Sequence, residues 1–252
     1  MKKQQTKTEF RPLWNNLFKF NWVFGLLLIL AVCIPRFILV LGSNRTGNYG
    51  SISIIMIISA IAPFVLLSKY GREKIGITKP GNYQWLFYSF ISGILLATIL
   101  FLLGYGLYSD TVNNWFVYIG KSYNISESIT EREKFIYFLI FAGTGMIFSP
   151  IGEELFFRGI VHSCFAASVG DRKASIIDGL AFSLTHLSHF GFVYLSGEWK
   201  ILIMPSLLWV SGMFVSSIVF FQCKKKTGSL LGAALSHAGF NLAMIYFIFY
   251  HL

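Results

Sequence analysis

Long stretches without Asp, Glu, Lys or Arg alternate with short charged segments along the 252-residue chain, and this pattern predicts membrane-spanning helices. A helix needs about 20 apolar residues to cross the hydrocarbon core of a bilayer. The candidate spans cover residues 22–41, 46–68, 80–109, 135–161, 174–194, 201–223 and 227–252. We therefore expect an all-α, polytopic transmembrane bundle of about seven spans, within a range of six to eight, in which residues 1–252 form a single transmembrane domain.

The composition favours a membrane protein over a soluble one. Hydrophobic residues make up 55% of the chain and charged residues 13%, whereas soluble domains carry about 25% charged residues. The net charge of +10 does not indicate a nucleic-acid partner, because the basic residues lie in short runs between apolar stretches. The three cysteines, Cys33, Cys164 and Cys223, include no CxxC pair, so the sequence predicts neither a disulfide framework nor a thiolate zinc site.

Lysine and arginine are concentrated in one of the two alternating sets of loops. The basic N-terminal segment of residues 1–21 and the loops after the second, fourth and sixth spans hold most of them. By the positive-inside rule, we expect these segments to be cytoplasmic and the C-terminus to lie outside the cell membrane. Arg36 lies inside the first span beside Pro35, and we interpret it as an arginine that snorkels from a kinked helix. The longest loop, residues 110–134, could hold an interfacial helix.

Ionisable side chains inside apolar segments are expensive to bury and so point to function. Glu153, Glu154 and Arg158 end the fourth span. Glu154 and Arg158 are four residues apart, which predicts an ion pair on one helix face. Adjacent helical side chains point about 100° apart, so Glu153 is directed elsewhere without a local counter-ion and is a candidate general base. A charge cluster at the membrane surface is the structural alternative.

Two further polar groups lie in the fifth and seventh predicted spans. His186 is the deeper of two histidines in the fifth, and we interpret His189, nearer the outer end, as structural. His237 and Asn241 are one helical turn apart on one face, and Gly239 between them favours close helix packing. At about 1.5 Å per residue, these residues and the glutamates fall at a similar depth, within reach of the cytoplasmic side. We therefore expect a buried reaction centre.

A glutamate, two histidines and an asparagine suit the hydrolysis of an amide. Glu153 with His186 could activate a water, either directly or on a metal. His237 and Asn241 could donate hydrogen bonds to the developing oxyanion. Glu153, His186 and His237 could also bind a divalent metal such as zinc, although their spacing matches no recognised zinc motif.

The segments Glu153-Glu154-x-x-x-Arg158, Phe182-x-x-x-His186 and His237-x-x-x-Asn241 resemble the three motifs of the CPBP family of intramembrane proteases. This family includes the type II CAAX prenyl endopeptidase and the bacterial Abi proteins linked to bacteriocin processing and immunity. The resemblance covers roughly residues 135–246 and implies an intramembrane catalytic cavity open to the membrane and to the cytoplasmic side. It implies that Glu153 activates water with help from His186. It also implies that His237 and Asn241 surround the oxyanion, that Glu154 and Arg158 support them, and it leaves metal-bound and metal-free mechanisms open.

The sequence thus predicts an intramembrane endopeptidase that acts on a membrane-associated peptide or protein in the lipid bilayer. Its Lys-, Ile- and Phe-rich composition is typical of a bacterial protein, for which the resemblance suggests processing of a peptide precursor rather than of a prenylated protein. The alternative is a non-proteolytic membrane scaffold or bacteriocin-immunity protein, for which Glu153→Ala would have no effect. A transporter is disfavoured, because the sequence has no internal repeat.

Overall fold

The computed structural model describes residues 7–48, 50–126 and 128–252, and its regular structure is almost entirely helical. The helices are α1 (Pro12–Asn15), α2 (Trp22–Thr46), α3 (Gly50–Leu66), α4 (Lys69–Lys74), α5 (Gln84–Tyr108), α6 (Trp115–Lys121), α7 (Glu131–Glu154), α8 (His162–Val169), α9 (Asp171–Thr185), α10 (Ile203–Thr227) and α11 (Leu230–Tyr250). A π-helical segment, η1 (Leu155–Val161), joins α7 to α8, and a 3-10 turn, η2 (His186–Ser188), follows α9. The strands β1 (Phe192–Leu195) and β2 (Glu198–Ile201) form an antiparallel hairpin.

Five helices in the described part of the chain are long and apolar enough to cross a membrane. They are α2, α5, the continuous run α7–η1–α8, α10 and α11. Helix α3 is apolar but shorter, with 17 residues. The protein is therefore a polytopic helical membrane protein, as predicted, but with fewer full-length candidate spans than seven. The largest difference is in the fifth predicted span, residues 174–194, because α9 ends at Thr185 and the chain continues as η2 and the hairpin.

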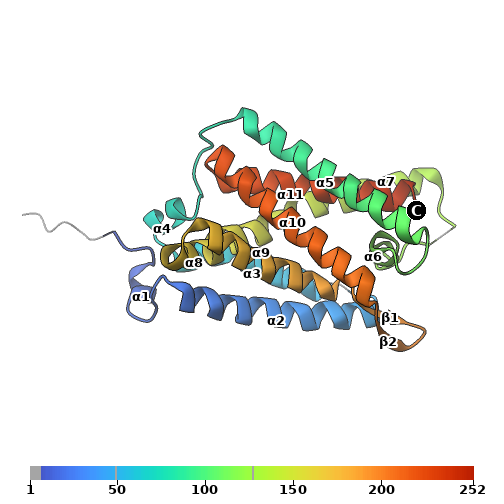
Figure 1. The fold of residues 1–252 in the computed structure, drawn as a ribbon, viewed down its shortest axis with the longest axis horizontal. Helices are drawn as coiled ribbons and strands as arrows, with labels where there is room; N and C mark the ends of the chain where they lie inside the picture. Colours follow the sequence, from blue (N-terminus) through green and yellow to red (C-terminus); the bar gives the residue numbers. More distant parts are fainter. Residues whose placement is uncertain (1–6, 49, 127) are drawn as a thin grey trace, which may run out of the picture.

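The helices run back and forth between two ends of the bundle (Figure 1). The basic end comprises α1, α4 and the connections at residues 66–84, 169–171 and 224–230. The hairpin end comprises the end of α2, α6, the β-hairpin and the C-terminus. A short helix, α6, does lie within the long loop of residues 110–134. Residues 1–6 of the basic N-terminal segment lie outside the described residues.

Local signals set the boundaries of the helices that carry the site. Thr130 and Glu133 form a capping box at the start of α7, in which each side chain accepts a hydrogen bond from the other residue's backbone N–H. Helix α10 ends at Thr227 and is followed by Gly228, whose φ of 69° is a left-handed conformation that glycine adopts without strain. Ser229 then caps α11 through its side chain. This tight connection makes α10 and α11 antiparallel neighbours.

Helices α5 and α11 approach closely because glycines remove side chains from their contact. A Cβ atom added to Gly239 would clash with the backbone carbonyl of Phe90 on α5. A Cβ atom added to Gly93 would clash with the backbone carbonyl of Ser236 on α11. The close packing predicted at Gly239 is therefore confirmed, and it fixes the helix that carries His237 and Asn241.

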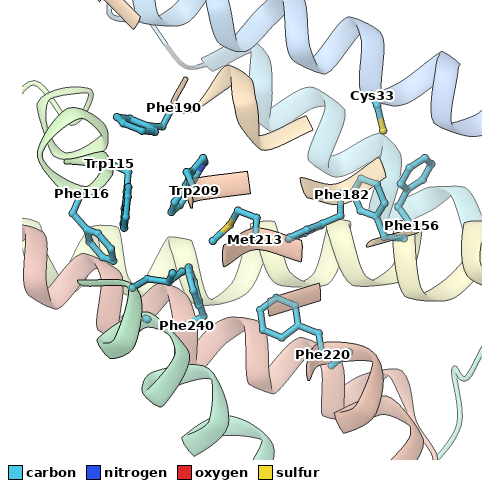
Figure 2. Packing of buried hydrophobic residues seen from close by; sticks show 14 of the residues in the cluster. Cys33, Trp115, Phe116, Phe156, Phe182, Phe190, Trp209, Met213, Phe220 and Phe240 are labelled. Atoms are coloured by element: carbon cyan, nitrogen blue, oxygen red, sulfur yellow. The ribbon is translucent and has the colours of Figure 1, made fainter. Parts of the chain in front are cut away.

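Aromatic side chains fill the centre of the bundle around the site (Figure 2). Phe156 from η1, Phe182 from α9 and Phe220 from α10 are nearly inaccessible to solvent. Toward the hairpin end, the fully buried Trp115 of α6 packs against Trp209 of α10, with ring centroids 6.1 Å apart. Large rigid rings contribute much buried apolar area, so the polar groups described below lie in a well-packed setting.

Candidate active site

Glu153, His186, His237 and Asn241 converge on one cavity of about 750 Å³. They come from α7, η2 and α11, so the structure brings together residues that lie on three separate segments of the sequence. Glu154 and Arg158 are more deeply buried, at 1% and 0% exposed, and are not among the residues that line this cavity. The predicted site residues are therefore gathered into a lining group and a buried supporting group.

Glu153 uses one carboxylate oxygen for structure and directs the other toward a histidine. Its Oε1 accepts hydrogen bonds from Ser149 Oγ at 2.6 Å and from Arg36 Nη2 at 2.9 Å. Its Oε2 is buried, has no hydrogen-bond partner among the described residues, and lies 3.8 Å from His186 Nε2. A buried acceptor without a partner is costly, so this oxygen is the group that a ligand or water in the cavity would satisfy.

Arg36 is the counter-ion of Glu153, and its interpretation as a snorkelling arginine is wrong. The side chain is 4% exposed and points into the bundle from α2, where it pairs with a carboxylate that is 2% exposed. Glu153 has no counter-ion on its own helix, as the sequence indicated, but it has one from a residue 117 positions away. Pairing of this kind offsets the cost of burying both charges.

The hydrogen bonds of His186 determine which of its ring nitrogens faces the cavity. Nδ1 lies 2.8 Å from the backbone carbonyl oxygen of Phe182. A carbonyl oxygen only accepts, so Nδ1 carries a hydrogen, and Nε2 of the neutral ring is an acceptor directed at Glu153. The ring also packs on the Phe182 ring, with centroids 4.3 Å apart. Phe182 therefore fixes both the tautomer and the position of His186.

Glu154 joins Arg158 to His237. Its Oε2 lies 3.2 Å from Nε of Arg158, so the predicted ion pair is confirmed. Its Oε1 accepts a hydrogen bond from His237 Nδ1 at 2.8 Å. The guanidinium of Arg158 lies over the Phe182 ring, 4.2 Å from its centroid, in a cation–π contact. The two adjacent glutamates thus have separate partners, as their 100° divergence predicts.

His237 and Asn241 differ in the hydrogen-bond donors that they can offer to a ligand. Because Nδ1–H of His237 is directed at Glu154, its Nε2 donates only when the ring carries both protons. Asn241 donates from Nδ2 to the backbone carbonyl of Gly145 at 2.8 Å and retains a second amide hydrogen. Asn241 can therefore serve an oxyanion in any protonation state of the site, and His237 can do so as an imidazolium.

His189, interpreted from the sequence as structural, also lines the cavity. Its Nε2 lies 3.4 Å from Arg36 Nη2, and its ring centroid is 5.4 Å from that of His186. Sequence reasoning missed Arg36 and the place of His189 because both depend on how α2 packs against the turn after α9. The signal that could have indicated Arg36 was its charge inside an otherwise apolar span.

Glu153, His186 and His237 do not form an assembled metal-ligand cluster in this structure. Among the described residues, no group of three or more His, Cys, Asp or Glu side chains is arranged to hold a metal ion. The Arg36 guanidinium also bonds the Glu153 carboxylate that such a metal would need.

Residues 135–243 match the family model described as type II CAAX prenyl endopeptidase Rce1-like. The matched region contains Glu153, His186, His237 and Asn241, whereas Arg36 lies outside it. No curated protein and no solved structure matches the chain.

Proposed function

Residues 135–243 of this chain belong to the type II CAAX prenyl endopeptidase Rce1-like family of proteases, and on that premise we propose that the protein is an intramembrane endopeptidase. The observation that carries the proposal is the unpartnered Oε2 of Glu153, buried in the cavity and 3.8 Å from His186 Nε2. Both atoms are acceptors and cannot bond each other, but at this separation each can accept one hydrogen of a shared water.

The proposed reaction begins with a water held by Glu153 Oε2 and His186 Nε2. Glu153 takes a proton as the water oxygen attacks the scissile carbonyl carbon. The oxyanion formed in this step accepts hydrogen bonds from Asn241 Nδ2 and from the protonated His237. The C–N bond then breaks, and the proton held by Glu153 passes to the leaving nitrogen, so the products are a carboxylic acid and an amine.

Arg36, Glu154 and Arg158 are positioning residues in this proposal. Arg36 and Ser149 both bond Oε1 of Glu153, which leaves Oε2 as the oxygen available to water. Glu154 orients His237 through Nδ1, and Arg158 supplies the charge that pairs with Glu154. Preorganised partners of this kind remove the cost of reorienting the catalytic groups during the reaction.

The cavity lining favours a hydrophobic peptide segment as the substrate. Phe141, Phe148, Phe240, Met244 and Ile245 line it beyond the catalytic residues. We propose that the substrate is a membrane-associated peptide or protein of the cell membrane, such as a peptide precursor that is released by processing. The single domain that holds the site is proposed to comprise the whole chain, with residues 135–246 as its catalytic core.

The test compares the membrane-associated and secreted peptides of bacterial cells that produce the wild-type protein, Glu153→Gln or His237→Ala at matched levels. Glu153→Gln preserves the size of the side chain and its acceptor oxygen but removes the general base. Glu131→Gln, at an exposed glutamate near the start of the same helix, is the matched control. A peptide terminus that appears with the wild type and with Glu131→Gln, and is absent with both site variants, supports proteolysis.

Identical peptide profiles for all four proteins would refute the proposal. If Glu153→Gln also retained a cellular phenotype that depends on the protein, a non-proteolytic scaffold or bacteriocin-immunity role would account for it better.

A further inference from the structure

The catalytic cavity extends from Glu153 toward the hairpin end of the bundle. Beyond the catalytic residues its lining includes Thr144 on α7, Ile52 at the start of α3, Gly47 after α2, and Tyr123 and Asn124 after α6. The end of α2, the start of α3 and α6 lie at the hairpin end (Figure 1), and Thr144 lies on α7 between the start of that helix and Glu153. No residue of the basic-end connections at 66–84, 169–171 or 224–230 is among the residues that line this cavity. The route to the site therefore leads away from the basic end.

Basic residues are concentrated at the opposite end from this route. In the described chain, the basic end carries Lys7, Arg11, Lys19, Lys69, Arg72, Lys74, Lys79, Arg172, Lys173, Lys224, Lys225 and Lys226. The hairpin end carries Arg45, Lys121, Arg132, Lys134 and Lys200. Short loops rich in Lys and Arg remain on the cytoplasmic side of a membrane. The charge asymmetry thus assigns the basic end to the cytoplasm and the hairpin end to the outer side.

If the basic end is cytoplasmic, a cavity that extends toward the hairpin end opens away from the cytoplasm. We propose that substrate reaches Glu153 from the extracytoplasmic side, so that the protein cleaves a membrane-anchored polypeptide in the part that faces the outer leaflet. This inference rests on the proposed protease function and adds the side of the membrane from which the substrate comes.

The dimensions and lining of the cavity describe the segment that would enter it. Glu153 follows Phe141 by twelve positions on α7, which corresponds to roughly 18 Å along the helix. An extended polypeptide covers this distance with about five or six residues. The lining along this distance is mainly aromatic and aliphatic, with Thr144 and Ser149 among its polar members. We therefore expect an extended, largely apolar segment of about that length next to the scissile bond.

Cysteine labelling tests the sidedness. Lys121→Cys at the hairpin end and Lys173→Cys at the basic end are matched variants at exposed positions, and the native Cys33, Cys164 and Cys223 are buried. A membrane-impermeant maleimide is applied to intact bacterial cells and to lysed cells. The proposal expects Lys121→Cys to be labelled in intact cells and Lys173→Cys only after lysis. Labelling of Lys173→Cys in intact cells, or of Lys121→Cys only after lysis, overturns it.

A second measurement tests the route itself. Ser122 lines the cavity beside Lys121, so a bulky maleimide on Ser122→Cys in intact cells is expected to abolish the cleaved peptide, while Lys173→Cys treated in the same way keeps it. Cleavage that persists after complete modification of Ser122→Cys overturns the route. The labelling pattern does not depend on catalysis, so unchanged peptides with Glu153→Gln would refute the protease proposal separately, whatever the sidedness.

Discussion

Removing the charge of Arg36 tests whether its ion pair with Glu153 holds α2 against the catalytic helix. Arg36→Met replaces the guanidinium with an apolar side chain that occupies part of the same space. The carboxylate of Glu153 would then keep its bond from Ser149 and lose its counter-ion, while remaining 2% exposed. Burying the Glu153 carboxylate without a counter-ion raises the free energy of the folded variant.

The expected cost follows from the burial of both partners. Breaking a buried ion pair by removing one member destabilises a protein by about 3–5 kcal/mol, whereas replacing both members by neutral groups is often nearly neutral. We therefore expect Arg36→Met and Glu153→Gln each to lower the free energy of unfolding by about 3 kcal/mol. The double variant is expected to lose less than the sum of the two, because it leaves no unpaired charge.

Unfolding by SDS in mixed micelles, followed by the fluorescence of the six tryptophans, gives the free energy for each variant. Arg45→Met is the matched control, because Arg45 is exposed and lies in the last turn of the same helix. We expect its cost to be less than about 1 kcal/mol. A negligible cost for Arg36→Met, or additive costs in the double variant, would refute the ion-pair reasoning and restore the snorkelling interpretation.

Two further predictions concern the supporting structure of the site. Glu154→Gln removes the charge that holds Nδ1–H of His237. We expect the yield of cleaved peptide to fall roughly 30-fold, which corresponds to about 2 kcal/mol of transition-state stabilisation. An unchanged yield at matched protein level would contradict the positioning role. Gly239→Ala places a Cβ against the backbone of α5 and should lower the free energy of unfolding by about 1–3 kcal/mol. Gly143→Ala has open space around the added carbon and should not destabilise the protein in the same SDS titration, so equal losses for the two variants would disprove the close approach.

The sequence determined the features that depend on residues close together in the chain. Charge-free stretches identified the membrane helices, because hydropathy is a property of a local window. The Glu154–Arg158 pair followed from a spacing of four residues, which fixes neighbours on any helix. The alternation of basic and less basic loops is also a property of the sequence.

The sequence predicted the length of α9 less well than it predicted the other features. Its predicted span of residues 174–194 is almost free of charge, but Asp178 lies within it and the helix ends at Thr185. The segments η2 and β1 that follow α9 also lack Asp, Glu, Lys and Arg, but their backbone is no longer α-helical. Hydropathy records that a segment is apolar and not whether its hydrogen bonds continue along one helix, so the end of α9 required the three-dimensional structure.

Tertiary packing alone decided the partner of Glu153 and the direction of the cavity. Arg36 could have snorkelled to the membrane surface or paired inside the bundle, and its position in the sequence is compatible with both. The choice depends on the face that α2 turns toward α7, a contact between residues 117 positions apart. The cavity likewise depends on where side chains from α3, α7, α10 and α11 leave space. Local periodicity specifies which residues share a helix face, but not which helix that face contacts.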